Sequence, residues 1–264
     1  MADKKVTLKL ENVSKVFAKV ESDEVTHALH DVSVTMESGE FVSLVGPSGC
    51  GKSTILRLVA GLINPTLGTV TVDGKEVDGP SPDRGVVFQK PTLFPWLTVE
   101  KNIAFSLDVQ KKLAGNEDKV QRMINVIGLD KFKNDYPAQL SGGQKQRVAL
   151  ARTLVMKPKI LLLDEPLSAL DGVIKESIKG KIKQVAKELN LATIIVTHDP
   201  EEALSLSDRV MIMNGGHILQ YAEPEEIINQ PKDNFVTEFI LKQLEIKRNN
   251  ILTLFESAGN VGGN

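Results

Sequence analysis

Residues 46–53 read GPSGCGKS and constrain the fold of this chain more than any other segment. The apolar run 42–45 before them predicts a short strand, and apolar residues at helical spacing over 55–62 predict a helix after them. Glycines between a strand and a helix let backbone N–H groups point inward around phosphate oxygens, beside the positive end of the helix. We therefore predict a phosphate-binding loop in which Lys52 reaches the β- and γ-phosphates and Ser53 contacts Mg²⁺. A plain glycine-rich turn is the alternative, but the complete G-x-x-x-x-G-K-S spacing argues against it.

Two carboxylates follow a second apolar run. Residues 160–163 are aliphatic, and Asp164 and Glu165 come directly after them. A buried parallel strand ends in this way at the carboxyl edge of a sheet, where ligands of such folds bind. Asp164 would hold the Mg²⁺ shell there, and Glu165 would polarise the water that attacks the γ-phosphate. A solvated strand end can carry the same pair, so this assignment depends on the phosphate loop upstream.

Residues 140–147, LSGGQKQR, predict the start of a helix. Ser141 and Gln144 have the Ser-x-x-Gln spacing of a capping box, and apolar residues follow at helical spacing. Gly142 and Gly143 leave the N-terminus of this helix open to an anion. One nucleotide site has no room for this second phosphate-binding surface, so we expect a second copy of the chain to complete the site. An ordinary helix start is the alternative.

The sequence Leu-Ser-Gly-Gly-Gln at 140–144 resembles the signature of ATP-binding cassette (ABC) proteins, and the resemblance covers about residues 6–240. It implies an α/β fold: a P-loop NTPase (RecA-like) core with an antiparallel β subdomain and an inserted α-helical subdomain that carries the signature. We expect the core with its β subdomain at 1–90 and 156–240, the helical subdomain at 91–155, and a short tail at 241–264 that frays and is partly flexible.

The resemblance assigns further residues one at a time. Gln89 falls where the Q-loop glutamine of the family contacts the metal and the attacking water, and His198 falls at the switch histidine that contacts the γ-phosphate. Asp171 ends a segment similar to the D-loop, which crosses the dimer interface. Phe17 matches the aromatic residue that stacks on adenine.

Together these positions form the expected site for ATP and Mg²⁺. The catalytic residues are Glu165, His198, Gln89 and Lys52. The ATP ligands are Phe17, Gly46, Pro47, Ser48, Gly49, Cys50, Gly51, Lys52, Ser53 and Thr54. The metal ligands are Ser53, Gln89 and Asp164. The signature residues Ser141, Gly142, Gly143 and Gln144 act in trans, on the nucleotide of a second cassette.

Composition indicates that any membrane role depends on partners. With 32 basic and 34 acidic residues, no global field favours nucleic acid or an anionic membrane. No apolar run reaches the about 18 residues that span a bilayer, and the N-terminus lacks the apolar stretch of a secretion signal. The resemblance implies a second cassette, expected to be identical, integral membrane permease subunits and an extracytoplasmic substrate-binding protein. It places the chain peripherally on the cytoplasmic face of the inner membrane.

Other segments favour an importer. Residues 91–99 lie where family members form the groove for a coupling helix of the membrane subunit, and Phe94 and Trp96 are suitable apolar anchors. Residues 82–89, 93–97 and 207–227 are similar to the nitrate/sulfonate/taurine importer branch, which implies a small anionic nutrient as cargo. A soluble ABC ATPase that acts on nucleic acid or ribosomes is the alternative, but the chain shows neither coiled-coil heptads nor a second phosphate loop. A small-molecule P-loop kinase leaves the signature unexplained.

Cys50, the single cysteine, lies inside the phosphate loop. We expect the loop N–H groups and the helix N-terminus to favour its thiolate, so that alkylation blocks ATP binding. A small residue that merely fits is the alternative.

Overall fold

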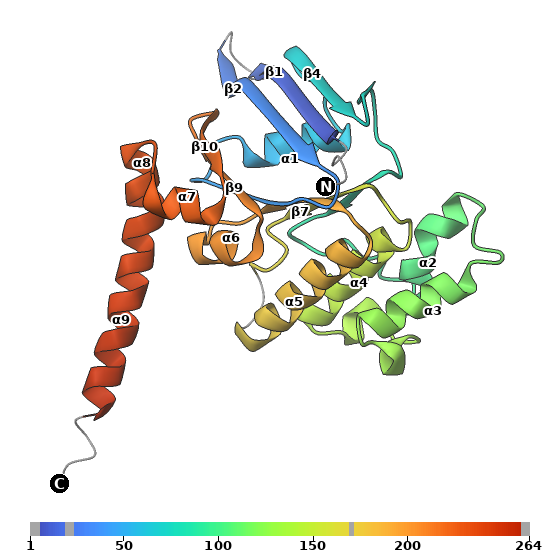
Figure 1. Ribbon diagram of the computed structural model, residues 1–264. Helices are drawn as coiled ribbons and strands as arrows, with labels where there is room; N and C mark the ends of the chain where they lie inside the picture. Colours follow the sequence, from blue (N-terminus) through green and yellow to red (C-terminus); the bar gives the residue numbers. More distant parts are fainter. Residues whose placement is uncertain (1–5, 19–23, 169–171, 260–264) are drawn as a thin grey trace, which may run out of the picture.

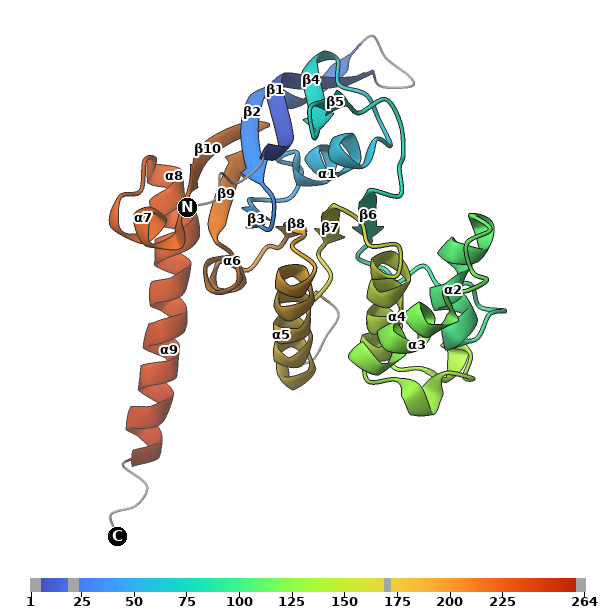
Figure 2. The same ribbon diagram turned by 45° about the vertical axis from the view of Figure 1, so that its right-hand side comes forward.

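The computed structural model describes residues 6–18, 24–168 and 172–259, so the expected D-loop residue Asp171 lies outside the described residues. Two sheets lie one above the other, with helix α1 (Lys52–Ala60) between them (Figure 1). A group of helices lies below strand β6 on one side, and helix α9 stands on the other side (Figure 2). Among the helices of these residues, none is both long and apolar enough to cross a membrane.

The larger sheet has six strands in the order β10-β9-β3-β8-β7-β6. They are β3 (Phe41–Val45), β6 (Arg84–Val87), β7 (Ile160–Asp164), β8 (Ala192–Val196), β9 (Arg209–Asn214) and β10 (His217–Ala222). All run parallel except β10, which pairs antiparallel with β9. Strands that are buried on both faces read as unbroken apolar runs. In β7, Leu162 faces α1, whereas Leu161 and Leu163 face α4 (Gly142–Leu154) and α5 (Gly172–Glu188).

The smaller sheet is antiparallel, with the order β2-β1-β4-β5. Its strands are β1 (Val6–Ala18), β2 (Val25–Glu37), β4 (Leu67–Val72) and β5 (Lys75–Glu76). The turn between β4 and β5 consists of Asp73 and Gly74, with φ angles of 50° and 74°. Positive φ at both positions matches the strand twist of a two-residue hairpin.

The helices before and after the signature form their own apolar core. They are α2 (Val99–Val109), α3 (Glu117–Val126) and α4, with short turns at Asp130–Phe132 and Pro137–Gln139. Ile103, Ile124 and Val148 are fully buried in this core. On another face of α4, Ala149 and Leu150 pack toward the parallel sheet, so α4 joins the helical group to the nucleotide side of the molecule.

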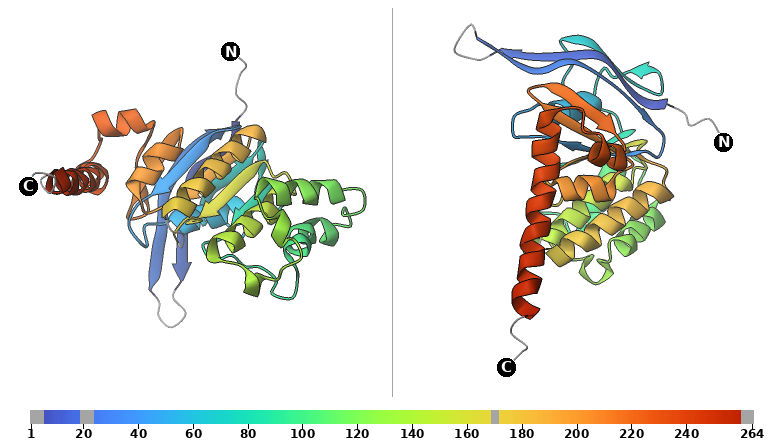
Figure 3. Two further views of the ribbon diagram at one scale, coloured as in Figure 1. Left: turned by 90° about the horizontal axis from the view of Figure 1, so that it is seen from below. Right: turned by 60° about the vertical axis from the view of Figure 1, so that its left-hand side comes forward.

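The C-terminal segment differs from the fraying tail that we expected. After α6 (Pro200–Leu206), α7 (Pro224–Asn229), α8 (Asn234–Val236) and a π-helical turn (Thr237–Leu241), the chain forms the long helix α9 (Lys242–Gly259). Figure 3 shows α9 along the side of the molecule. Ile240 and Leu244 anchor its start in a cluster that includes Ala203 of α6. These contacts join segments distant in sequence, which explains why the local pattern did not predict the helix.

Candidate functional site

The phosphate loop joins β3 to α1, as the sequence predicts. Gly51 is the N-cap of α1 and has φ +106°, and a Cβ there would lie 2.6 Å from the carbonyl oxygen of Ala28. A Cβ on Gly46 would lie 2.3 Å from the carbonyl oxygen of Met213. Neither position accepts a side chain unless the backbone moves, so these two glycines are required by the close packing of the loop.

Lys52 curls back over the loop that precedes it. Its Nζ donates hydrogen bonds to the carbonyl oxygens of Gly46 and Pro47, both at 2.8 Å. The residue is only 8% exposed. Because these acceptors are neutral, the positive charge stays available to a phosphate group bound in the loop.

Asp164 and Glu165 lie at the carboxyl end of β7. The Ser53 hydroxyl lies near the carboxylate of Asp164 and lowers its pKa. Burial, and next the charge of Glu165, raise the pKa of Asp164 above its ordinary value, although Arg57 and Lys52 offset part of this. Glu165 has φ +44°, a left-handed conformation that costs about 1–2 kcal/mol for a residue other than glycine. Such strain is typical of functional sites.

Two side chains contact or approach the carboxylate of Glu165. The Nε2 atom of Gln89 donates a hydrogen bond to Glu165 Oε2 at 3.1 Å and another to Ser168 Oγ at 3.4 Å. The Nδ1 atom of His198 lies 3.6 Å from the same Glu165 oxygen, and its side chain is 67% exposed. The structure therefore brings Gln89, Glu165 and His198 together from three separate strand ends.

A cavity of about 290 Å³ lies over the loop. It is lined by Thr26, His27, Ala28, Ser48, Gly49, Gly51, Lys52, Ser53, Thr54 and Glu165. Thr26, His27 and Ala28 are not among the site residues that the sequence predicts. Phe17 does not line the cavity, but it pairs with Thr26 across the β1–β2 hairpin and is 36% exposed. Phe17 lies on β1, which pairs with β2. This pairing would have indicated that Thr26, His27 and Ala28 of β2 lie near the site.

The signature residues cap α4 and lie apart from this cavity. The Ser141 amide donates to Gln144 Oε1 at 2.8 Å, and the Gln144 amide donates to Ser141 Oγ at 3.3 Å. The predicted capping box is thus confirmed. Ser141 and Gly142 are exposed, Gly143 is buried, and none of the described residues that line the cavity comes from 141–144. Within one chain, the helix N-terminus and the phosphate loop stay separate.

The residues present fit a magnesium ion. Ser53 and Asp164 supply a hydroxyl and a carboxylate oxygen, and Gln89 carries an amide oxygen, the ligand type that Mg²⁺ prefers. Burial and the charge of Glu165 raise the pKa of Asp164, and a bound cation would stabilise the ionised carboxylate against both effects.

Without metal or nucleotide, Asp164→Asn is expected to raise the Tm. The folded pKa of Asp164 lies above its ordinary value of 3.8, so the ionised carboxylate destabilises the fold, and this penalty fades as pH falls through the folded pKa. The gain in Tm should be largest at a pH well above the folded pKa of Asp164 and should disappear as the pH falls to the ordinary value of 3.8. Thermal melts in EDTA across that range measure it. Asp199→Asn is the control with the opposite sign, because the pKa of Asp199 is lowered. An Asp164→Asn protein that melts below wild type at every pH would contradict the assignment.

The expectation of a favoured Cys50 thiolate is wrong. Burial raises the pKa of the Cys50 thiol, and the charge of Lys52, whose Nζ lies 3.8 Å from Sγ, offsets only part of this rise. The helix N-terminus predicts the opposite direction, but Cys50 is only 3% exposed and desolvation dominates.

Alkylation of Cys50 is therefore expected to be slow. Iodoacetamide should modify the folded protein at least about tenfold more slowly than the unfolded chain. The raised pKa leaves less of the thiol ionised, and burial keeps the reagent from the sulfur. Mass spectrometry measures the rate. Modified protein should not bind ATP, because the added group would occupy the loop. If fully alkylated protein kept its ATP affinity, the packing around Cys50 would not constrain the nucleotide.

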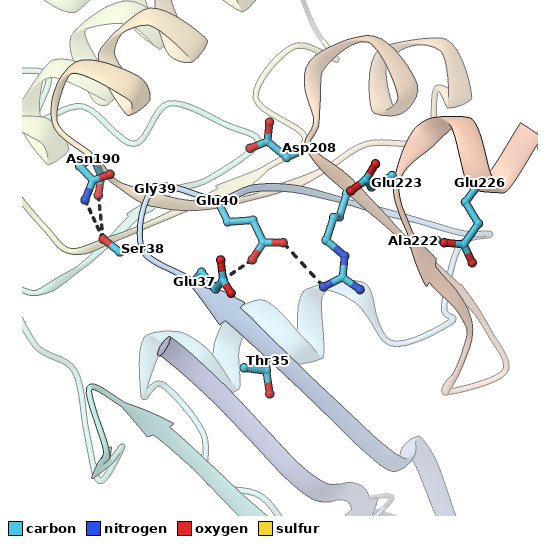
Figure 4. A pocket seen from close by; sticks show the side chains of 11 residues that line it. Thr35, Glu37, Ser38, Gly39, Glu40, Asn190, Asp208, Ala222, Glu223 and Glu226 are labelled. Atoms are coloured by element: carbon cyan, nitrogen blue, oxygen red, sulfur yellow. Dashed lines mark hydrogen bonds and ion pairs between the residues drawn. The ribbon is translucent and has the colours of Figure 1, made fainter. Parts of the chain in front are cut away.

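A second cavity, of about 680 Å³, lies at the opposite edge of the sheet, beside the starts of β3, β8 and β9 (Figure 4). Carboxylates dominate its lining, with Glu37, Asp208, Glu223 and Glu226 among them. The neighbouring Arg209 pairs with Glu40, at 3.8 Å between Nη1 and Oε1. This density of negative charge repels a triphosphate, which leaves the phosphate loop as the candidate nucleotide site.

The parallel sheet, the phosphate loop and the carboxylates at the end of β7 define a P-loop nucleotide-binding protein of the α/β class. A family model described as ABC transporter matches residues 29–168. The chain belongs to the ABC transporter family.

Curated relatives extend this likeness beyond the matched segment. A sulfate/thiosulfate import ATP-binding protein of Chromobacterium violaceum is 47% identical over 216 residues, which cover 81% of this chain and 59% of the relative. An Fe(3+) ions import ATP-binding protein of Rhizobium meliloti is 45% identical over 80% of this chain and 55% of the relative. A spermidine/putrescine import ATP-binding protein of Bacillus cereus is 45% identical over 79% of this chain and 65% of the relative. The chain thus spans 55 to 65% of the length of these relatives.

Solved structures of the ATP-binding cassette MJ0796 share the fold. They have a TM-score of 0.72 and 33% sequence identity, and they cover 82% of this chain and 98% of that cassette. Both are described as dimeric, and one as a post-hydrolysis state bound to ADP and Pi. The expected ABC cassette fold is therefore confirmed.

Proposed function

We propose that this chain binds and hydrolyses ATP as the cassette subunit of an ABC importer. The observation that carries the proposal is the position of Glu165: its carboxylate receives a hydrogen bond from Gln89, lies 3.6 Å from His198 and lines the cavity over the phosphate loop. A carboxylate at that place can orient water for attack on a γ-phosphate.

The other site residues would divide the remaining tasks. Lys52 and the loop N–H groups would hold the phosphates, and Ser53, Asp164 and Gln89 would hold Mg²⁺. A bound Mg²⁺ ion would supply charge neutralisation for the transferred phosphoryl group. His198 is placed to stabilise the charge that develops opposite Glu165. Phe17 offers an exposed ring for adenine.

A head-to-tail dimer would complete the site. In one chain the signature helix lies apart from the cavity, and its exposed N-terminal residues Ser141 and Gly142 can bind a phosphate of the partner cassette. The dimeric state of MJ0796 supports this arrangement. We assign the D-loop role to Asp171 on sequence alone. We also propose the division into core (1–90, 156–240) and helical subdomain (91–155), which the separate apolar clusters support.

The importer role would need membrane partners. The names of the curated relatives specify import, so we propose permease subunits, an extracytoplasmic binding protein and a peripheral position on the cytoplasmic face of the inner membrane. Trp96, which is 69% exposed, and the adjacent Phe94 are suited to receive a permease helix.

The cargo of such an importer is less defined. The relatives carry names for sulfate, iron and polyamine cargo, so the resemblance to the nitrate/sulfonate/taurine branch stays a prediction. The soluble ATPase that acts on nucleic acid is less favoured, because these relatives are importer subunits and the chain has a net charge of −2.

Copurification from detergent-solubilised membranes of the native host tests the proposal. A tagged chain should bring down a multi-span permease in stoichiometric amount, and the complex should hydrolyse ATP. Recovery with ribosomes or DNA, or with no membrane protein, would support the soluble alternative instead.

A further inference from the structure

The backbone around His198 is fixed by its two neighbours in sequence. The amide of Asp199 donates a hydrogen bond to Thr197 Oγ1 at 3.1 Å. The carboxylate of Asp199 then caps α6, where Oδ1 accepts a hydrogen bond from the Glu201 amide at 3.0 Å. The direction of the exposed His198 side chain therefore depends on how firmly this N-cap is held.

Lys247 of α9 binds the same N-cap from outside. Its Nζ lies 2.8 Å from Asp199 Oδ1 and 3.3 Å from Glu201 Oε2. The dipole of a helix disfavours a cation at its N-terminus, so the two carboxylates, and not α6 itself, hold the ammonium group there. Burial alone would raise the pKa of Asp199, but its hydrogen bond and charge interaction with Lys247 lower it below its ordinary value.

The inner side of the same turn is held by α5. The buried carboxylate of Glu202 accepts a hydrogen bond from Thr197 Oγ1 at 2.6 Å and forms an ion pair with Lys175 of α5. The start of α6 is thus held between α5 on one side and α9 on the other. Glu202 is buried, whereas Lys175, Asp199 and Lys247 are partly exposed.

We propose that Lys247 is a positioning residue, which holds the Asp199 cap and thereby fixes the direction in which His198 presents its imidazole to Glu165. Lys247 contacts Asp199, and Asp199 forms hydrogen bonds with Thr197 and Glu201. These bonds hold the backbone on either side of His198, whose imidazole lies 3.6 Å from Glu165. In its effect on catalysis, the inference rests on the proposed function. It gives α9 a role at the site, although none of the described residues of α9 lines the cavity.

Imidazole NMR resonances test the position of His198 without any turnover. The chain has four histidines, so the His198 signal can be assigned with a His198→Gln variant. Lys247→Ala should shift the His198 signal, whereas the signals of His27, His30 and His217, which stack on one another, should not move. Lys247→Arg keeps the charge and should return the His198 signal to its wild-type position. Lys242→Ala is the matched control, because among the described residues Lys242 forms an ion pair with Glu238 of the preceding turn and with no other side chain.

Steady-state kinetics measure the consequence. Lys247→Ala should lower kcat about three- to tenfold with an unchanged KM for ATP, since a misplaced catalytic group affects the chemical step and not the binding of nucleotide. Lys242→Ala should leave both constants unchanged, and Lys247→Arg should recover kcat.

The outcomes separate the inference from the proposed function. If Lys247→Ala changes Tm but leaves the His198 resonance in place, the ion pair is only structural and the inference is wrong. A His198 shift with a lower kcat supports it. If the wild-type protein does not hydrolyse ATP at all, the proposed function fails, while the NMR comparison still decides whether Lys247 positions His198.

Discussion

Replacing Glu165 with Gln is expected to reduce ATP hydrolysis by about 100- to 10,000-fold, the range for loss of a general base. The amide can still accept the hydrogen bond from Gln89, but it cannot take a proton from water. ATP binding should persist, because Lys52 and the loop are unchanged. The variant should then accumulate as an ATP-bound dimer, which gel filtration with and without ATP measures.

Two comparisons make this result specific to Glu165. Glu223→Gln removes a charge from the acidic cavity at the opposite edge of the sheet and should hydrolyse ATP like wild type. The melting temperature of Glu165→Gln should stay near or above that of wild type, since the change removes repulsion from the half-buried Asp164. Rapid turnover with unchanged dimerisation would refute the assignment of Glu165 as the base.

Local patterns predicted the parts of the site that depend on backbone geometry. The strand and helix on either side of the phosphate loop and the capping box at Ser141 depend on residues within a few positions. The spacing of such motifs encodes the local fold. Family resemblance then added Gln89 and His198, which no local pattern could connect with Glu165.

The features that sequence did not predict depend on tertiary contacts. Helix α9 is anchored by Ile240 in a cluster with α6, and the cavity wall from β2 depends on how β1 and β2 pair. The pKa shift of Cys50 also depends on tertiary contacts and could not be predicted from the sequence. The helix N-terminus is visible in the sequence, but the burial that raises the pKa of the thiol comes from packing against residues distant in the chain.

Lys52→Ala is expected to weaken ATP binding at least about 30-fold, because the variant loses a charge-assisted contact to the phosphates. The loss should be greater for ATP than for ADP, since Lys52 would reach both the β- and γ-phosphates. Fluorescence titration with a labelled nucleotide, and competition by ATP and ADP, measure both affinities.

This difference between nucleotides separates lost contact from lost folding. Lys52 is almost buried and satisfies two carbonyls of the loop, so its removal also destabilises the fold. Partial unfolding would reduce the affinities for ATP and ADP by the same factor, whereas loss of a phosphate contact would not. Ser141→Arg is the matched control: it blocks the helix N-terminus that serves the partner cassette and leaves the phosphate loop of its own chain intact. The Ser141→Arg monomer should therefore bind ATP like wild type but fail to dimerise. Normal ATP affinity in Lys52→Ala would mean that the loop over α1 is not the nucleotide site.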